Sequence, residues 1–416
     1  MSQPDTSAGC DDAHDLVLAA ATLQFENGQT TLHVVEDAER LAAALHCPAR
    51  IFVGWDLLVL QPDAGTPGRD RLVAVRPLAV DMGRVAATLD ALERFCRGAL
   101  TVAALRARLD HIAHLPPVSL TRFAAMAAAG AAALGVIFGA TNPVILLLIA
   151  ASGGAGACLR RAVGRLSHNP FIQPFCAALL AGLIGAVASR FHLGALDFLV
   201  AECPCMILVP GPHLLNGTLD LARTRVTLGF SRVAYACLII LAICAGLLLG
   251  LALAGGSLPV GGKPPPVPLA YDVVAAGVAV AAYGTFFSLP WRALYIPAAI
   301  GMIAHAARWF VVVTLGANIE VGALIACLLA GSAAAVIADR RRLPFAGLAF
   351  ASVVSLIPGV FVFRMAGGLV RMVGLAERTP LSLLTATIAD GGTAFIVLMA
   401  MAFGLLVPRM IVERLR

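Results

Sequence analysis

Apolar and polar residues follow two different patterns along this chain. Over about the first 117 residues, apolar positions recur at helix and strand spacing between many charged residues. From residue 118 onward, long uncharged runs alternate with short polar segments. A helix needs about 20 apolar residues to cross the ~30 Å hydrocarbon core of a bilayer. The pattern therefore predicts a water-soluble domain over residues 1–117 and a membrane region after it.

The pattern within residues 1–117 predicts a small α+β domain. Turn residues, among them Asn27-Gly28, separate its elements, and Pro116-Pro117 marks its end. Helical spacing predicts helices over residues 15–25, 34–45, 80–96 and 101–112. Runs rich in β-forming side chains predict an antiparallel sheet with strands over residues 50–54, 56–61 and 71–77.

The uncharged runs after residue 118 predict an all-α membrane region with ten transmembrane helices. Residues 140–143 divide the run between Arg122 and Arg160, which is too long for one crossing, into two helices. A Gly/Pro-rich linker over residues 255–270 separates a first half, 118–254, from a second half, 271–416, with about five helices each. The other eight predicted crossings cover residues 166–189, 193–210, 233–254, 273–289, 293–313, 321–338, 343–363 and 381–407.

Composition and charge are those of a membrane protein. Hydrophobic residues make up 60% of the 416 positions and charged residues 13%, against about 25% charged in soluble proteins. The first 120 residues hold 15 of the 24 acidic and 10 of the 30 basic residues, so they carry a net charge of −5 and the remainder +11. Because the later arginines lie between apolar runs, as in cytoplasmic loops, they argue against nucleic-acid binding.

The distribution of arginine predicts the orientation in the membrane. The acidic start of the chain lacks the basic segment of a signal peptide, so we expect residues 1–117 to stay in the cytoplasm. The opposite side then carries little positive charge except in residues 363–380, which we expect to be amphipathic and packed back into the protein. The arginines expected on the cytoplasmic side are residues 160, 161, 165, 223, 225, 292, 340, 341, 342, 409, 414 and 416.

Two short motifs occur in the same order in both halves. Leu-Ala-Gly at 180–182 precedes Leu-Val-Pro-Gly at 208–211, and Leu-Ala-Gly at 329–331 precedes Leu-Ile-Pro-Gly at 356–359. The glycine and the proline are 28 residues apart in the first copy and 27 in the second. Because five crossings are an odd number, the second copy would be inverted in the membrane, which is typical of secondary transporters. Two coincidentally similar apolar hairpins are the alternative.

The order of these segments resembles the threonine/serine exporter family. The resemblance extends from about Leu16 to Pro408 and includes the acidic α+β domain and the Val-Arg-Pro segment at 75–77. It implies a carrier in the cytoplasmic membrane that exports threonine and serine and is driven by the proton gradient. The segments that carry the resemblance most clearly are LVPGPHLLNGTLDL at 208–221, LPWRALYIPAAIG at 289–301 and SLIPGVFVFRMAGGL at 355–369.

Ionisable side chains at membrane depth are candidates for function, because each costs about 2.5–3.5 kcal/mol to insert. Glu202 and Asp390 are the clearest cases. A carboxylate in a dry cavity can take up and release a proton near neutral pH, so we predict that these two residues couple transport to protons. The alternative is a structural ion pair with an arginine such as Arg308 or Arg364.

The two Pro-Gly pairs are the predicted translocation site. Proline removes a helical hydrogen bond, and unpaired backbone groups are tolerated at membrane depth only where protein or water receives them. Such groups match the ammonium and carboxylate of an amino acid. The alternative is that each pair only ends a helix at the membrane interface. The predicted substrate site comprises Pro210, Gly211, His213, Asn216, Thr218, Ser355, Pro358 and Gly359.

Two other function classes fit parts of the sequence. Cys203-Pro204-Cys205 suggests a proton-driven carrier of soft metal ions, although cysteines of an apolar core are the simpler interpretation. A membrane-tethered hydrolase would use residues 1–117, where no nucleophile and base occur at a recognisable spacing. We therefore expect a transporter with an amino acid, protons and lipid as partners, and with no cofactor or bound metal. Gly-x-x-x-Gly pairs such as Gly246/Gly250 fit internal packing and leave a homo-oligomer open.

Overall fold

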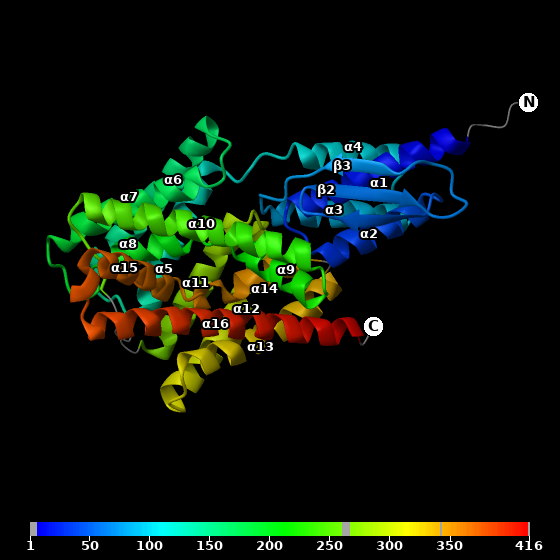
Figure 1. The fold of residues 1–416 in the computed structure, drawn as a ribbon. Helices are drawn as coiled ribbons and strands as arrows, with labels where there is room; N and C mark the ends of the chain where they lie inside the picture. Colours follow the sequence, from blue (N-terminus) through cyan, green and yellow to red (C-terminus); the bar gives the residue numbers. More distant parts are fainter. Residues whose placement is uncertain (1–5, 260–266, 342, 415–416) are drawn as a thin grey trace, which may run out of the picture.

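A computed structural model describes residues 6–259, 267–341 and 343–414. The chain is mainly helical, with one small sheet in its N-terminal part (Figure 1). The predicted linker over residues 255–270 lies partly outside the described residues, and Arg342 and Arg416, predicted on the cytoplasmic side, lie wholly outside them.

The elements follow one another in two groups. The N-terminal part contains α1 (Thr6–Glu26), α2 (Thr31–Ala44), β1 (Ala49–Val53), β2 (Leu57–Pro62), β3 (Arg71–Ala74), α3 (Met82–Cys96) and α4 (Val102–Ala113). The membrane region contains α5 (Leu120–Ile137), α6 (Pro143–Leu166), α7 (Ile172–Ser189), α8 (Leu199–Met206), α9 (Gly211–Ala222), α10 (Val226–Leu253), α11 (Leu269–Phe286), η1 (Trp291–Ala293), α12 (Tyr295–Trp309), η2 (Phe310–Thr314), α13 (Ile319–Arg341), α14 (Phe345–Val353), η3 (Val354–Leu356), α15 (Gly359–Leu375), η4 (Ala376–Arg378) and α16 (Leu381–Arg414).

The first four helices pack on a three-stranded antiparallel sheet in the order β1-β2-β3. Ile51 of β1 pairs with Leu60 of β2, which in turn pairs with Arg71 of β3. Alternate residues of β2, Leu58 and Leu60, are fully buried, as expected where one face of a sheet is covered. The strands occupy the segments for which the apolar pattern predicts them.

Among the described residues, nine helical segments are long and apolar enough to cross a membrane. Nine is close to the predicted count of about ten, but the predicted crossings over residues 193–210 and 343–363 are not among the nine. The first segment contains only the eight-residue α8, and the second contains α14, η3 and the start of α15. Pro210 and Pro358 cause the interruptions, because a proline ring clashes with the preceding turn and lacks an amide proton. Residues 363–380, predicted as an amphipathic loop, lie mostly in α15.

Corresponding helices of the two halves make matching contacts. α7 packs on α10 at Gly182, where an added Cβ would overlap the carbonyl oxygen of Leu247. α13 packs on α16 at Gly331, where an added Cβ would lie 2.6 Å from the carbonyl oxygen of Gly404. These are the glycines of the two Leu-Ala-Gly motifs, and they allow the close approach on which helix packing in membranes depends. Gly250 also faces α7, so it serves internal packing.

Helices of the two halves run in opposite directions relative to the N-terminal part. α10 begins beside this part, where Arg232 donates to the hydroxyl of Thr31 at 3.4 Å. α16 ends beside it, where Nη2 of Arg409 lies 2.9 Å from Nε2 of His33, and Figure 1 shows the C-terminal end of α16 next to α2 and α9. Similarly, α5 begins where α11 ends.

Buried polar contacts attach the N-terminal part to the membrane region. Thr31 donates to Oδ2 of Asp220 at 2.9 Å, and the same oxygen lies 3.1 Å from Nε of Arg232. Nearby, the side-chain amide of Asn216 donates to the carbonyl of Gly28 at 2.9 Å. Asp220 and Arg232 are both buried. Removing one partner of a buried ion pair is strongly destabilising. Because Asp220 and Asn216 both lie on α9, a movement of this helix would disturb the contacts that hold the N-terminal part.

Candidate functional site

Both Pro-Gly pairs form the same local turn. In each, the glycine amide donates to the carbonyl two residues earlier, at 2.9 Å for Gly211 and 2.8 Å for Gly359. Pro210 has φ −83° and ψ 64°, and Pro358 has φ −78° and ψ 42°. These values are close to an inverse γ-turn. Each turn therefore joins two helices, α8 to α9 and η3 to α15, and leaves neighbouring backbone groups outside the helical ladder.

Each turn packs against the short helix that precedes the other turn. Gly211 faces the ring of Phe350 in α14 so closely that an added Cβ would overlap it. Gly359 faces Met206 in α8, where an added Cβ would lie 2.8 Å from the side-chain Cγ. The hydroxyl of Tyr283 donates to the carbonyl of Met206 at 2.6 Å, which satisfies one acceptor at the end of α8. The two predicted breaks, 148 residues apart in the chain, thus meet inside the membrane region.

A cavity of about 380 Å³ adjoins the first break. Its walls come from α6, α7, α9, α10 and α11, and Leu78–Val80 of the N-terminal part also lines it. The predicted site residue His213 lines this cavity, with its ring packed edge-on against Tyr235 at a centroid distance of 5.0 Å. Arg160, which the sequence interpretation used only as a marker of topology, also lines it. The other polar side chains in its lining are His168 and Gln173.

A chain of hydrogen bonds leads to the second break. Nδ1 of His305 lies 3.0 Å from Oδ2 of Asp272, and Nε2 lies 2.7 Å from Oγ of Ser355. All three residues are buried, and Arg308 lies 4.0 Å from Asp272. Ser355 is among the residues predicted from the sequence, whereas Asp272 and His305 are not. Both are ionisable residues in or beside an apolar run, which is the signal that selected Glu202.

Glu202 and Asp390, the carboxylates predicted for proton coupling, lie in one electrostatic cluster with Arg364. Nε of Arg364 is 3.8 Å from Oε1 of Glu202, and Glu202 also interacts electrostatically with Asp390. Both carboxylate oxygens of Glu202 are buried without a hydrogen-bond partner in the part of the chain that the structure describes. The predicted coupling residues and the arginine of the alternative interpretation therefore belong to the same cluster. A carboxylate buried in this way gains or loses a proton with a large change in local energy.

Two predicted substrate-site residues make other contacts. Asn216 binds the carbonyl of Gly28 in the N-terminal part, and the hydroxyl of Thr218 donates to the carbonyl of Leu215 on its own helix at 2.9 Å. The structure therefore assigns Asn216 a docking contact, whereas it brings Pro210, Gly211, Pro358 and Gly359 together.

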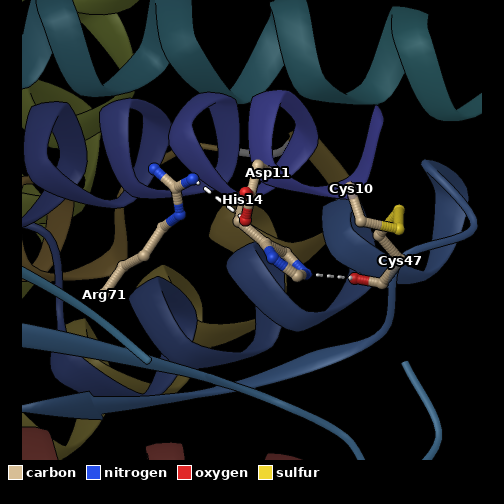
Figure 2. The surroundings of a disulfide bond; sticks show 5 residues. All are labelled: Cys10, Asp11, His14, Cys47 and Arg71. Atoms are coloured by element: carbon tan, nitrogen blue, oxygen red, sulfur yellow. Dashed lines mark hydrogen bonds and ion pairs between the residues drawn. A yellow bond between two sulfur atoms is a disulfide. The ribbon is translucent and has the colours of Figure 1, made fainter. Parts of the chain in front are cut away.

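The cysteines of the predicted metal motif are free, whereas two cysteines of the N-terminal part are cross-linked. Cys203 and Cys205 are free thiols, fully buried in α8. In the N-terminal part, Cys10 and Cys47 form a disulfide that the sequence analysis missed, because their positions are 37 residues apart and carry no pattern (Figure 2).

Figure 2 shows polar residues beside this disulfide. Arg71 pairs with Asp11 at 3.0 Å, and the imidazole of His14 contacts the carbonyl of Cys47 at 3.1 Å. Across the described ranges 6–259, 267–341 and 343–414, no group of three or more His, Cys, Asp or Glu side chains is placed to hold a metal ion.

Long apolar helices and two interrupted helices that cross inside the protein define a polytopic membrane protein of the transporter class. A family model described as "Putative threonine/serine exporter" matches residues 15–254, and one described as "Threonine/Serine exporter, ThrE" matches residues 272–411. The chain belongs to the threonine/serine exporter family, which is a family of transporters and not of enzymes. The predicted family membership is confirmed.

A relative of known sequence supports the same assignment. It is described as a probable threonine/serine exporter of Mycobacterium tuberculosis and is 27% identical over 388 residues, which cover 86% of this chain and 71% of the relative. No solved structure matches this chain.

Proposed function

We propose that this protein exports threonine and serine from the bacterial cytoplasm across the inner membrane, in exchange for protons. The crossing of the two broken helices at Pro210-Gly211 and Pro358-Gly359 carries this proposal. A zwitterionic amino acid needs acceptors for its ammonium and donors for its carboxylate. Interrupted helices supply both within the membrane, and family membership supports the choice of substrate.

Two inverted five-helix repeats would explain how the breaks move. What supports the inversion is that α10 begins and α16 ends beside the N-terminal part. Rocking of one repeat against the other would expose the crossed breaks first to one side of the membrane and then to the other. Three positions of the first half recur 148 residues later: Gly153 as Gly301, Arg160 as Arg308 and Pro210 as Pro358.

Two buried clusters support coupling to protons. One contains Glu202 and Asp390 with Arg364, and the other is the chain from Asp272 through His305 to Ser355. A proton held by the second cluster changes the hydrogen bonding of a residue only three positions before the Pro358 turn. Proton binding can therefore favour one arrangement of the break over another, which is the differential interaction that coupled transport requires.

The charge distribution supports a cytoplasmic N-terminal part. Arg161 donates to the carbonyl of Val118 at the start of the membrane region, and Arg223 and Arg409 both pair with Glu413 beside α2. Arginine is enriched on the cytoplasmic side of membrane proteins. Export would then start with a substrate that enters from the side of the N-terminal part.

Flux in proteoliposomes tests the proposed function. We expect efflux of labelled threonine and serine to saturate, to be stimulated by substrate on the opposite side and to accelerate when the exterior is acidified. Vesicles without protein are the control for leakage. Flux without saturation or counterflow would indicate a channel and contradict the proposal. Threonine flux that is indifferent to Asp390→Asn would overturn the assignment of Asp390 to coupling.

The same vesicles test the alternative of a soft-metal carrier. We expect threonine flux to persist when Cys203 and Cys205 are both replaced by serine, because the thiols are buried away from the cavity lining. Copper or zinc uptake that this double replacement abolishes would favour the metal carrier instead.

A further inference from the structure

We infer that the cavity at the first break binds the carboxylate of an amino acid through Arg160, with Leu78–Val80 of the N-terminal part as its lid. The identity of the ligand rests on the proposed function. The cavity of about 380 Å³ has the size of a small-molecule site. It is lined by Leu208–Pro210 and His213, so a bound solute would touch the break itself.

Arg160 supplies a half-buried cation to this cavity. Its guanidinium lies over the ring of Phe286 at 4.5 Å from the centroid, and its Nη1 atom is buried without a hydrogen-bond partner in the described part of the chain. The described residues that line the cavity include no Asp or Glu. Guanidinium presents a fixed fork of charged donors that matches a carboxylate. A guanidinium with a buried, unpaired nitrogen beside a cavity therefore indicates a place for an anion.

Neighbouring and corresponding arginines are satisfied in other ways. Arg161 donates to the carbonyl of Val118 at 2.8 Å, and Arg165 is exposed to solvent. Arg308, which lies 148 residues after Arg160, has the carboxylate of Asp272 at 4.0 Å. The second half places an acidic side chain beside Arg308, whereas the first half places the cavity beside Arg160. The missing negative charge would come from the ligand.

Two further polar side chains of the lining suit the rest of a hydroxy amino acid. Nδ1 of His213 is buried and makes no hydrogen bond to the residues that the structure describes. The hydroxyl of Tyr235 reaches the carbonyl of Leu78 only at 3.4 Å. An imidazole nitrogen and a phenol can each donate or accept. They can serve a ligand hydroxyl or ammonium while Arg160 holds the carboxylate.

The lid is held by one contact within it and by another two residues after it. Besides the contact of Tyr235 with Leu78, the amide of Met82 donates to the carbonyl of Phe287 at 2.9 Å. These bonds hold residues 78–82 against α10 and the end of α11. A solute that enters from this side must displace the segment, so the N-terminal part would control access to Arg160.

Binding of labelled threonine to the full chain in lipid nanodiscs tests this inference, with competition by threoninol, which lacks the carboxylate. The wild type should prefer threonine at least about tenfold, as expected for a charge-assisted pair. Arg160→Gln should weaken threonine binding by about the same factor and abolish the preference. Arg160→Lys keeps the charge and should retain part of the preference for threonine. Arg165→Gln removes an exposed cation from the same helix and should change neither quantity.

The outcomes separate this inference from the proposed function. Unchanged binding and preference in Arg160→Gln, with wild-type export intact, would overturn only the inference. If the wild type binds neither threonine nor serine, the proposed substrate fails. Binding of a panel of simple carboxylates to the wild type and to Arg160→Gln then tests the site. If no carboxylate binds in a way that depends on Arg160, the inference is overturned.

A lipid phosphate is the other anion to test. Nanodiscs of phosphatidylcholine, with or without phosphatidylglycerol, distinguish it from an amino acid. If Arg160→Gln alters binding of the anionic lipid but not of threonine, the assignment to an amino acid is wrong.

Discussion

Nε2 of His305 lies 2.7 Å from the hydroxyl oxygen of Ser355, three residues before Pro358. On the other side of the ring, Nδ1 lies 3.0 Å from Asp272. A titratable group of α12 is therefore bonded directly to the segment that interrupts the second broken helix. A carboxylate, an imidazole and a hydroxyl also occur together in hydrolases. In the transport cycle proposed here, the same order of groups would connect a proton-binding site to the backbone of the Pro358 turn.

Replacement of either end of this contact should uncouple transport from protons. We expect Ser355→Ala and His305→Asn to lower flux driven by a pH gradient at least about tenfold, because positioned proton-transfer groups have effects of that size or larger. Counterflow at equal pH should persist. Ser352→Ala is the matched control, since the Ser352 hydroxyl donates to the carbonyl of Leu348 on its own helix at 2.8 Å. Equal losses of driven flux and counterflow would contradict a coupling role.

Removal of Arg364 should destabilise the protein by leaving Glu202 without its cationic neighbour. Breaking a buried pair costs about 3–5 kcal/mol, so we expect Arg364→Ala to lower the thermal midpoint in detergent. Adding Glu202→Gln should recover part of the loss, because the uncompensated carboxylate is then absent. Arg371→Ala, an exposed position on the same helix, should have little effect. An equally small effect of Arg364→Ala would refute the electrostatic cluster.

The close contact between the breaks predicts strong steric effects at Gly211. A methyl group there would collide with the ring of Phe350, and we expect Gly211→Ala to lower stability by about 1–3 kcal/mol. Phe350→Leu in the same chain should restore part of it. Gly374→Ala provides the control, since no atom lies within 4 Å of the added Cβ. Thermal unfolding measures all of these variants, and a Gly211→Ala protein as stable as the wild type would show that the breaks do not touch.

Acid should weaken the attachment of the N-terminal part through His33. Burial, together with the charge of Arg409, lowers the pKa of His33 from 6.5 to about 4, against the opposing effect of Glu413 and Asp339. The folded state thus binds this proton more weakly than the unfolded state. Stability should be unaffected above about pH 6.5 and should fall as the pH decreases from 6.5 towards 4, by at most about 3 kcal/mol.

Unfolding of the wild type and of His33→Gln between pH 7.5 and 4.5 measures this effect. Other carboxyl groups titrate in both proteins, so the difference between them isolates His33. We expect the variant to lose the additional decrease below pH 6.5. Parallel curves would show that His33 does not contribute.

The redox state of Cys10 and Cys47 tests the orientation. The cytoplasm keeps thiols reduced. If the N-terminal part is cytoplasmic, both cysteines should react with a maleimide in rapidly quenched cells and should be protected in protein purified in air. Cys96, a free and exposed thiol, should react in both samples. Protection of Cys10 and Cys47 within intact cells would place the N-terminal part in an oxidising compartment. A maleimide of high mass shifts the protein on a gel for each free thiol, so the shift distinguishes reduced from disulfide-bonded Cys10 and Cys47.

Much of the membrane region could be predicted because its signal is local. Runs long enough to cross a bilayer must be apolar throughout, and proline must interrupt a helix wherever it lies in one. Pro210 and Pro358 were therefore predicted as breaks, and α10 and α16 as crossings. Two of the predicted crossings, over residues 193–210 and 343–363, differ in the structure because apolar composition cannot distinguish one continuous helix from two short helices joined at Pro-Gly.

The partners of polar side chains were decided only by the tertiary structure. His305 and Ser355 are 50 residues apart in the chain, and Asn216 is 188 residues from Gly28. Periodicity reports which face of a helix is buried, but a hydrogen bond depends on which distant helix covers that face. By itself, the sequence determined the apolar helices, the positions of the breaks and the family. Packing decided that the breaks cross, that His305 meets Ser355 and that Arg160 is left facing a cavity.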